Sequence, residues 1–164
     1  MKNENSKFGT TSHTVEEATR KAENYCVYQD RCHQEVVTKL KSLRMIPDAI
    51  DLILVHLIEH NFLNETRFAC SFARGKHRIK HWGKIRIVRE LKMKGISDYN
   101  IKQGLKEIPY EDYYNSFDNL AERHWEHMTE RVKLVKRKKF CDFMLRKGFE
   151  SAMIYEKVKE LEKE

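Results

Sequence analysis

Apolar residues recur along most of the chain at spacings of three and four, the period of an α-helix that is buried on one side. Phe68 and Phe72 follow this spacing in one segment, and Ile85, Val88 and Leu91 follow it in the next. Glycine and proline, which a sheet protein needs in its frequent turns, number only six and two. The pattern predicts an all-α fold.

The apolar pattern is repeated. Segments that begin at Leu91 and Met144 keep every apolar position when Gly95 is aligned with Gly148, and a weaker third copy has Arg44 at the glycine position. The spacing of roughly fifty residues is typical of a three-helix unit in a helical array. The sequence therefore predicts an elongated tandem array of three three-helix repeats.

Capping signals mark where the helices begin and end. Gly95 and Gly148 follow apolar stretches and suit the left-handed conformation that ends a helix. Ser97 is a good N-cap, and Thr14 with Glu17 forms a capping-box pattern. The predicted helices span residues 15–28, 32–44, 47–60, 65–78, 83–94, 98–108, 110–127, 130–147 and 151–162.

These helices divide the chain into four predicted segments. Residues 1–13 are expected to form a flexible N-terminal tail, followed by repeats over residues 14–61, 62–109 and 110–164. Hydrophobic residues make up 40% of the chain, which is enough for a core in each repeat. We expect this core to be shallow.

Segments that direct a protein into or across a membrane are not evident. The longest apolar run, Ile50 to Ile58, is broken by Asp51 and His56 and is shorter than the roughly 20 residues of a membrane helix. The first fourteen residues are polar and have no apolar secretory core. We therefore expect a cytoplasmic monomer without membrane contact.

Histidine and cysteine occur without a strong metal-site pattern. His56/His60, His77/His81 and His124/His127 are spaced to share a helix face, but no glutamate completes an HExxH motif and no cysteines cluster. We expect no metal site, and we expect four free thiols that are buried or half-buried: Cys26, Cys32, Cys70 and Cys141.

The motifs of common enzyme classes are also missing from the sequence. It contains no Gly-rich phosphate loop, no GxSxG elbow and no distinctive pair of carboxylates. We therefore expect a protein that is not an enzyme and that has no cofactor.

Charge is distributed in blocks. Residues 67–97 hold ten Lys/Arg against Glu90, a net charge of +9, and residues 131–149 hold eight against Asp142, a net charge of +7. The stretch between them, residues 98–130, has a net charge of −5, so the overall +7 conceals two basic blocks. A polyanion or an acidic protein surface is the implied partner, and the alternative is a solvated helical surface that binds nothing.

The candidate binding residues come from these blocks. Helical spacing places Arg67, Arg74 and Arg78 on one stripe, opposite Phe68 and Phe72. The predicted partner-binding residues are Arg67, Arg74, Lys76, Arg78, Lys80, Lys84, Arg86, Arg89 and Lys92, with a secondary basic patch at Lys136, Arg137, Lys138 and Lys139. Trp82 lies between the two helices of the first block, where we expect it to pack rather than to stack on a nucleobase.

Two segments resemble the RecX family of regulatory proteins. FLNETRFACSFARGKHRIKHWGKIRIVRELKMKGIS, from Phe62, is similar to the family's central motif of a polar cap, an RFA triplet, a basic stretch and an ELxxKGI ending. YCVYQDRCHQEVVTKL, from Tyr25, is similar to the family's opening YLxxRxxSxxELxxKL. The chain departs from the family pattern at Cys32 (usually serine), Asn64 (usually aspartate) and Arg44 (usually glycine).

The resemblance implies both a fold and a function. RecX proteins consist of three tandem three-helix units, bind the RecA recombinase filament and restrain its ATP hydrolysis, extension and strand exchange in recombination and the response to DNA damage. The partners implied are RecA and, through the basic surface, single- or double-stranded DNA. Two alternatives remain open: a DNA-binding helical module that does not regulate a recombinase, and a scaffold that binds only protein.

Overall fold

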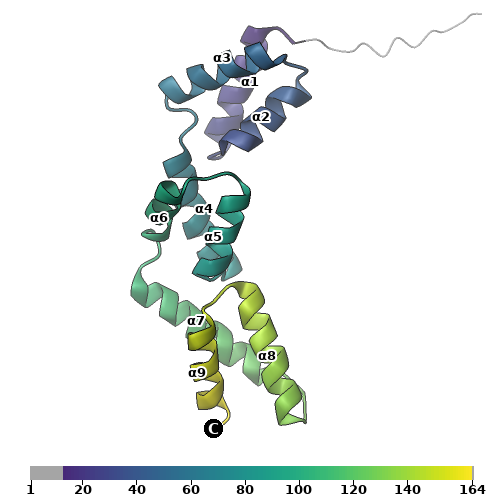
Figure 1. Ribbon diagram of the computed structural model, residues 1–164, viewed down its shortest axis with the longest axis vertical. Helices are drawn as coiled ribbons and strands as arrows, with labels where there is room; N and C mark the ends of the chain where they lie inside the picture. The colour runs from purple at the N-terminus through teal and green to yellow at the C-terminus, as the bar shows by residue number, and fades with distance from the viewer. Residues whose placement is uncertain (1–12, 164) are drawn as a thin grey trace, which may run out of the picture. The chain divides into compact units, whose positions relative to one another are not determined.

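The computed structural model describes residues 13–163, and within this range the chain forms nine α-helices and no strand (Figure 1). The all-α fold is confirmed, and every predicted helix occurs with ends that differ by at most three residues. Apart from His13, the predicted flexible tail lies outside the described residues. The helices are α1 (Val15–Tyr28), α2 (His33–Ser42), α3 (Pro47–Glu59), α4 (Glu65–Lys80), α5 (Lys84–Met93), α6 (Asp98–Leu105), α7 (Tyr110–Glu126), α8 (Lys133–Lys147) and α9 (Ser151–Leu161).

Predicted caps begin several of these helices. The Thr14 hydroxyl accepts a hydrogen bond from the Glu17 amide (3.1 Å), and the Glu17 carboxylate accepts one from the Thr14 amide (2.9 Å). The Ser97 hydroxyl accepts from the Asn100 amide (3.3 Å). These bonds satisfy amide groups that the first helical turn leaves without intrahelical partners.

The chain divides after Asn64 into two compact units. The first contains α1 to α3, whose core includes Ala22, Leu40 and Leu57, each fully buried. The second contains α4 to α9, in two groups of three helices (Figure 1). This agrees with three three-helix repeats, while the exact boundaries predicted between them stay a prediction.

Within the second unit, α4 and α6 pack with their backbones close together. A Cβ atom built on Gly104 of α6 would lie 2.7 Å from the carbonyl oxygen of Ala69 on α4. Phe68, Ile87 and Ile101 are buried around this contact. The small residues therefore let α4 and α6 approach closely, which fixes the position of the basic helix α4.

The turn after the second helix of each repeat has the same geometry. The turn residue at which the repeats were aligned has a left-handed backbone conformation in all three copies: Arg44 (φ 61°), Gly95 (φ 75°) and Gly148 (φ 90°). The next amide then bonds to the carbonyl five residues back: Met45 to Leu40, Ile96 to Leu91 and Phe149 to Met144. This recurrence confirms the alignment of the repeats and shows that Arg44 adopts the conformation that glycine has in the other two.

The second and third repeats are joined through backbone atoms at two glycines. The Gly83 amide donates to the Lys147 carbonyl (2.8 Å), and the Ile85 amide donates to the Gly148 carbonyl (3.0 Å). A Cβ atom on Gly83 would lie only 2.2 Å from the Gly148 oxygen. The chain therefore needs glycine at position 83 because no side chain fits between the two turns.

Replacing Arg44 with glycine should stabilise the protein. The left-handed conformation costs a residue with a side chain about 1 kcal/mol, and Arg44 is exposed. We expect Arg44→Gly to raise the free energy of unfolding by up to about 1 kcal/mol, measured by urea denaturation. Gly95→Val should lower the free energy of unfolding by about 1 to 2 kcal/mol or more, because a β-branched residue is poorly tolerated in this conformation. Equal stability of the two variants would contradict the shared turn geometry.

Gly83→Ala should destabilise the joint between the second and third repeats. The added methyl group would collide with the Gly148 carbonyl, so the two turns must separate and lose their hydrogen bonds, at a cost of about 2 kcal/mol or more. The matched control is Gly75→Ala, since nothing lies within 4 Å of a Cβ atom there. Gly75→Ala should stabilise α4 by about 0.5 to 1 kcal/mol, so thermal melting that moves both variants in the same direction would contradict this assignment.

Candidate partner-binding surface

The predicted arginine stripe on α4 does not consist of three equivalent residues. Arg74 donates to the Glu107 carboxylate, which follows α6, at 2.7 Å, and Arg67 is half-buried. Arg78 is exposed, and no described residue pairs with its side chain. Phe68 is buried on the core side of α4. Of the three arginines, Arg78 is the one most available to a partner.

Trp82 is covered by cations that the sequence assigned to partner binding. The Arg86 guanidinium lies 4.0 Å from the centre of the indole ring, and the Lys76 ammonium lies 5.2 Å from it. The edge of the indole also meets Phe72, with ring centres 6.3 Å apart. Trp82 therefore packs within the second repeat, and cation–π contacts hold Lys76 and Arg86 beside it.

The remaining cations of the first block differ in exposure. Lys84 lies over the Tyr113 ring at 4.5 Å and is partly covered. Arg89 and Lys92 are exposed and form ion pairs with Glu90 (3.5 Å) and Asp98 (3.4 Å). Exposed pairs of this kind are weak, so both side chains can exchange their carboxylate for another anion. Lys80 is also exposed.

The secondary patch is largely engaged in contacts within the third repeat. Lys136 lies 4.2 Å from the centre of the Trp125 ring, Arg137 pairs with Glu162 (3.6 Å), and Lys139 pairs with Glu130 (2.7 Å). Lys138 is exposed, with no described partner for its side chain. This end of α8 therefore offers fewer available cations than its run of four basic residues suggests.

The other end of α8 brings the two basic blocks together. The Lys147 ammonium donates to the Lys80 carbonyl at the end of α4 (2.9 Å), and the Arg86 guanidinium donates to the Arg146 carbonyl near the end of α8 (3.0 Å). Cations stabilise helix C-termini. Lys147 of the second basic block therefore caps α4, and Arg86 of the first basic block caps α8. Burial and the charges of Arg86, Lys80 and Arg123 lower the pKa of Lys147. The sequence-based site omitted Arg123, Arg146 and Lys147, because only the folded joint brings them beside the first block.

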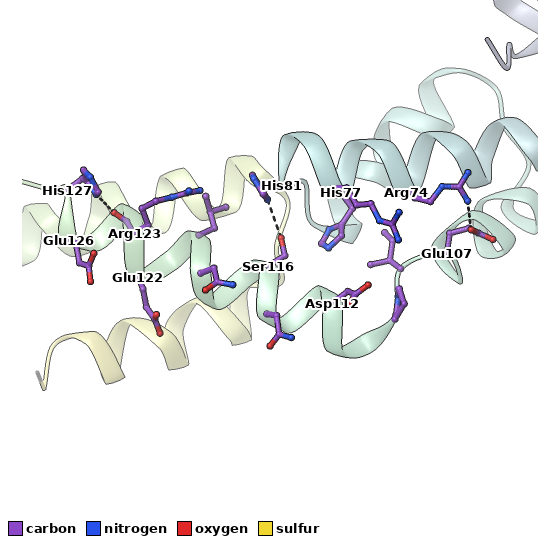
Figure 2. A pocket seen from close by; sticks show the side chains of 16 residues that line it. Arg74, His77, His81, Glu107, Asp112, Ser116, Glu122, Arg123, Glu126 and His127 are labelled. Atoms are coloured by element: carbon purple, nitrogen blue, oxygen red, sulfur yellow. Dashed lines mark hydrogen bonds and ion pairs between the residues drawn. The ribbon is translucent and has the colours of Figure 1, made fainter. Parts of the chain in front are cut away.

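A polar groove of about 840 Å³ runs between α4 and α7 (Figure 2). Arg74, Arg78 and His81 line it from the α4 side, and Ser116 and Arg123 line it from α7. His81 directly follows α4 and shares a hydrogen bond of 3.4 Å with the Ser116 hydroxyl, as Figure 2 shows. Burial, followed by the charges of Lys147 and Arg123, lowers the pKa of His81.

A buried tyrosine supports the joint beside this groove. The Tyr113 hydroxyl donates to the Glu150 carboxylate (2.6 Å) and accepts from the Lys84 amide (3.1 Å), so it connects α7 to the starts of α9 and α5. The Tyr113 ring packs against His77 and Phe149. Burial, followed by the hydrogen bond to Glu150, raises the pKa of Tyr113 far above its usual value.

The described part of the chain shows no gathered metal ligands. Nowhere in residues 13–163 do three or more His, Cys, Asp or Glu side chains form a group that could hold a metal ion. None of the four cysteines is part of a disulfide; Cys70 is partly exposed and the other three are buried. Across the same residues, no helix is both long enough and apolar enough to cross a membrane.

Comparison with known proteins shows that the central part of the chain, which carries this surface, is similar to one family. Residues 64–105 match the family described as RecX, second three-helix domain. The regulatory protein RecX of Bacillus cytotoxicus is 27% identical over 150 residues, which cover 92% of this chain and 56% of that protein. RecX of Enterococcus faecalis is 28% identical over 133 residues, 81% of this chain and 50% of that protein. The chain therefore spans about half the length of these curated relatives.

Solved structures agree with this result. The crystal structure of RecX from Lactobacillus salivarius is similar with a TM-score of 0.72 and 28% identity, over 90% of this chain and 96% of that chain. A second crystal structure of a regulatory protein RecX shares the fold, with a TM-score of 0.76 and 23% identity. The arrangement of helices described above is therefore that of RecX proteins.

Removing the Tyr113 hydroxyl should weaken the joint. Tyr113→Phe leaves the Lys84 amide and the Glu150 carboxylate without this partner, so we expect a loss of about 1 to 3 kcal/mol in the free energy of unfolding near pH 7. Because the pKa of Tyr113 is raised in the folded state, its contribution is present below about pH 10, where an unfolded tyrosine begins to ionise, and is lost above it. Denaturant melts from pH 8 to 11 should show a shallower alkaline decline for Tyr113→Phe, and parallel curves would contradict this role.

Proposed function

We propose that this chain, which is similar to RecX regulatory proteins, belongs to their family, binds the filament that the RecA recombinase forms on DNA and restrains its activity. The restrained steps would be ATP hydrolysis, filament extension and strand exchange. The observation that carries the proposal is that the family match and the basic surface fall in the same segment of the chain. The segment that matches the second three-helix domain of RecX, residues 64–105, contains all nine cations of the predicted central surface.

The contacts described above favour particular residues of that surface. Arg78, Lys80, Arg89 and Lys92 are exposed and are either without a described partner or in weak surface pairs. Lys76, Lys84 and Arg86 lie over aromatic rings and keep the surface in shape. We propose that the exposed group meets the acidic protein surface and the phosphates that a recombinase filament presents.

The test is an ATPase assay of the cognate RecA on single-stranded DNA. Addition of this protein should reduce ATP hydrolysis, and the double variant Arg78→Glu/Lys80→Glu should inhibit at least about tenfold less strongly, because two cations become repulsive. The matched control is Lys133→Glu/Lys159→Glu, which makes the same charge change at two exposed lysines of α8 and α9 that have no described partners and lie outside both predicted basic patches. Equal loss of inhibition in both variants would indicate a nonspecific charge effect and would contradict a central site.

The alternative function, a DNA-binding module without recombinase regulation, gives a different result. In that case the protein would bind naked single- or double-stranded DNA with a steep dependence on salt, and at saturating concentration on a preformed filament it would leave ATP hydrolysis unchanged. That outcome would reject the recombinase proposal.

A further inference from the structure

Three basic side chains from different parts of the second unit lie near one another: His81 and Arg123 line the α4–α7 groove, and Lys147 reaches the backbone beside His81. His81 follows α4, Arg123 belongs to α7, and Lys147 ends α8. Lys147 is anchored next to His81 by its hydrogen bond to the Lys80 carbonyl (2.9 Å). Arg123 lines the groove together with His81, and both Arg123 and Lys147 are close enough to lower the pKa of His81. We refer to His81, Arg123 and Lys147 as the basic corner.

The carboxylates of the groove do not neutralise the basic corner. Glu107 is paired with Arg74, and Glu122 bonds to Lys157 at 2.8 Å. Glu122 and Glu126 also line the groove, and in Figure 2 their side chains extend from α7 away from the Arg123 side chain. Asp112 lies toward the other end of the groove, nearer to Glu107 (Figure 2). The charged groups that act on His81 are Lys147, Arg123 and His77, and none is a carboxylate.

The backbone at His81 supports a role for its side chain. His81 has a φ of 52°, the left-handed conformation that Gly95 and Gly148 adopt at other helix ends. A residue with a side chain is disfavoured there, and such conformations tend to persist at functional sites. The imidazole of His81 points into the groove toward Ser116 (Figure 2).

We propose that His81, Arg123 and Lys147 bind a phosphate group. The guanidinium offers paired N–H donors, the ammonium offers a point charge, and a protonated imidazole offers one further donor, which together suit a tetrahedral oxyanion. A smaller hollow of about 290 Å³ leads from Arg123 to His124 and Phe143, whose rings stack with centres 3.7 Å apart. An aromatic surface beside a phosphate site suits a nucleic-acid strand, since a base can stack there.

The ligand is therefore the phosphate of a single nucleic-acid strand rather than free phosphate. The proposed function enters this assignment at one point only: it supplies the strand, as the DNA of a recombinase filament. Binding of the strand to His81, Arg123 and Lys147 is tested on the isolated protein, without a recombinase. Failure of the phosphate site would leave inhibition of ATP hydrolysis intact, and failure of that inhibition would leave the phosphate site intact.

The test follows the His81 imidazole by NMR, with its signal assigned from its absence in His81→Gly. The first probe is an eight-residue oligothymidylate, whose charge is constant between pH 5 and 8, and the second is inorganic phosphate. An anion at the basic corner stabilises the imidazolium, so oligothymidylate should raise the pKa of His81, and its affinity should increase as the pH falls. Millimolar inorganic phosphate should produce a smaller rise, because it lacks the neighbouring base.

Arg123→Gln should lower the oligothymidylate affinity at least about tenfold and abolish the rise in the His81 pKa. Lys133→Gln, which removes an exposed charge at the start of α8 and lies outside the predicted binding residues, is the matched control and should lower affinity less than twofold. An unchanged His81 pKa with both probes, or equal effects of Arg123→Gln and Lys133→Gln, would overturn the site. A response to inorganic phosphate as strong as that to oligothymidylate would overturn the assignment to a nucleic-acid strand.

Discussion

The contact between Gly83 and Gly148 is the constraint on which the rest of the second unit depends. Two turns from different repeats meet backbone to backbone, with hydrogen bonds of 2.8 and 3.0 Å and no space for a side chain. This contact places the ends of α4 and α8 side by side. At the same joint, the Lys147 ammonium donates to the Lys80 carbonyl and the Arg86 guanidinium donates to the Arg146 carbonyl.

This joint also explains how the basic residues divide between structure and binding. A helix C-terminus carries partial negative charge, so the first cations near it serve as caps. Arg86 and Lys147 have this role, and the aromatic rings of Trp82 and Tyr113 hold further cations. High positive charge in the sequence therefore overstates the charge offered to a partner. The available charge lies in exposed side chains beside these caps, such as Arg78 and Lys80.

Local signals in the sequence were sufficient for the helices but not for the surface. Ser97, Thr14 and the glycines at positions 95 and 148 act through neighbours within five residues, so their roles could be predicted. The pairing of Arg74 with Glu107 spans 33 residues and depends on how α6 packs against α4. The spacing of residues within one helix cannot show that Arg74 will meet a carboxylate beyond the end of another helix. Arg67, Arg74 and Arg78 therefore differ in exposure and pairing, although helical spacing places them on one stripe.

The same limit explains why Arg123 could not be selected from the sequence. It lies in the stretch of net charge −5, where acidic neighbours along the chain suggest a neutralised side chain. In the folded unit, Glu122 and Arg123 both line the groove, but the Glu122 carboxylate is paired with Lys157, whereas no described carboxylate pairs with the Arg123 side chain. Net charge over a segment averages opposite faces of a helix, whereas a partner meets one face. The surface charge of a helical repeat protein is therefore set by packing between its repeats as much as by composition.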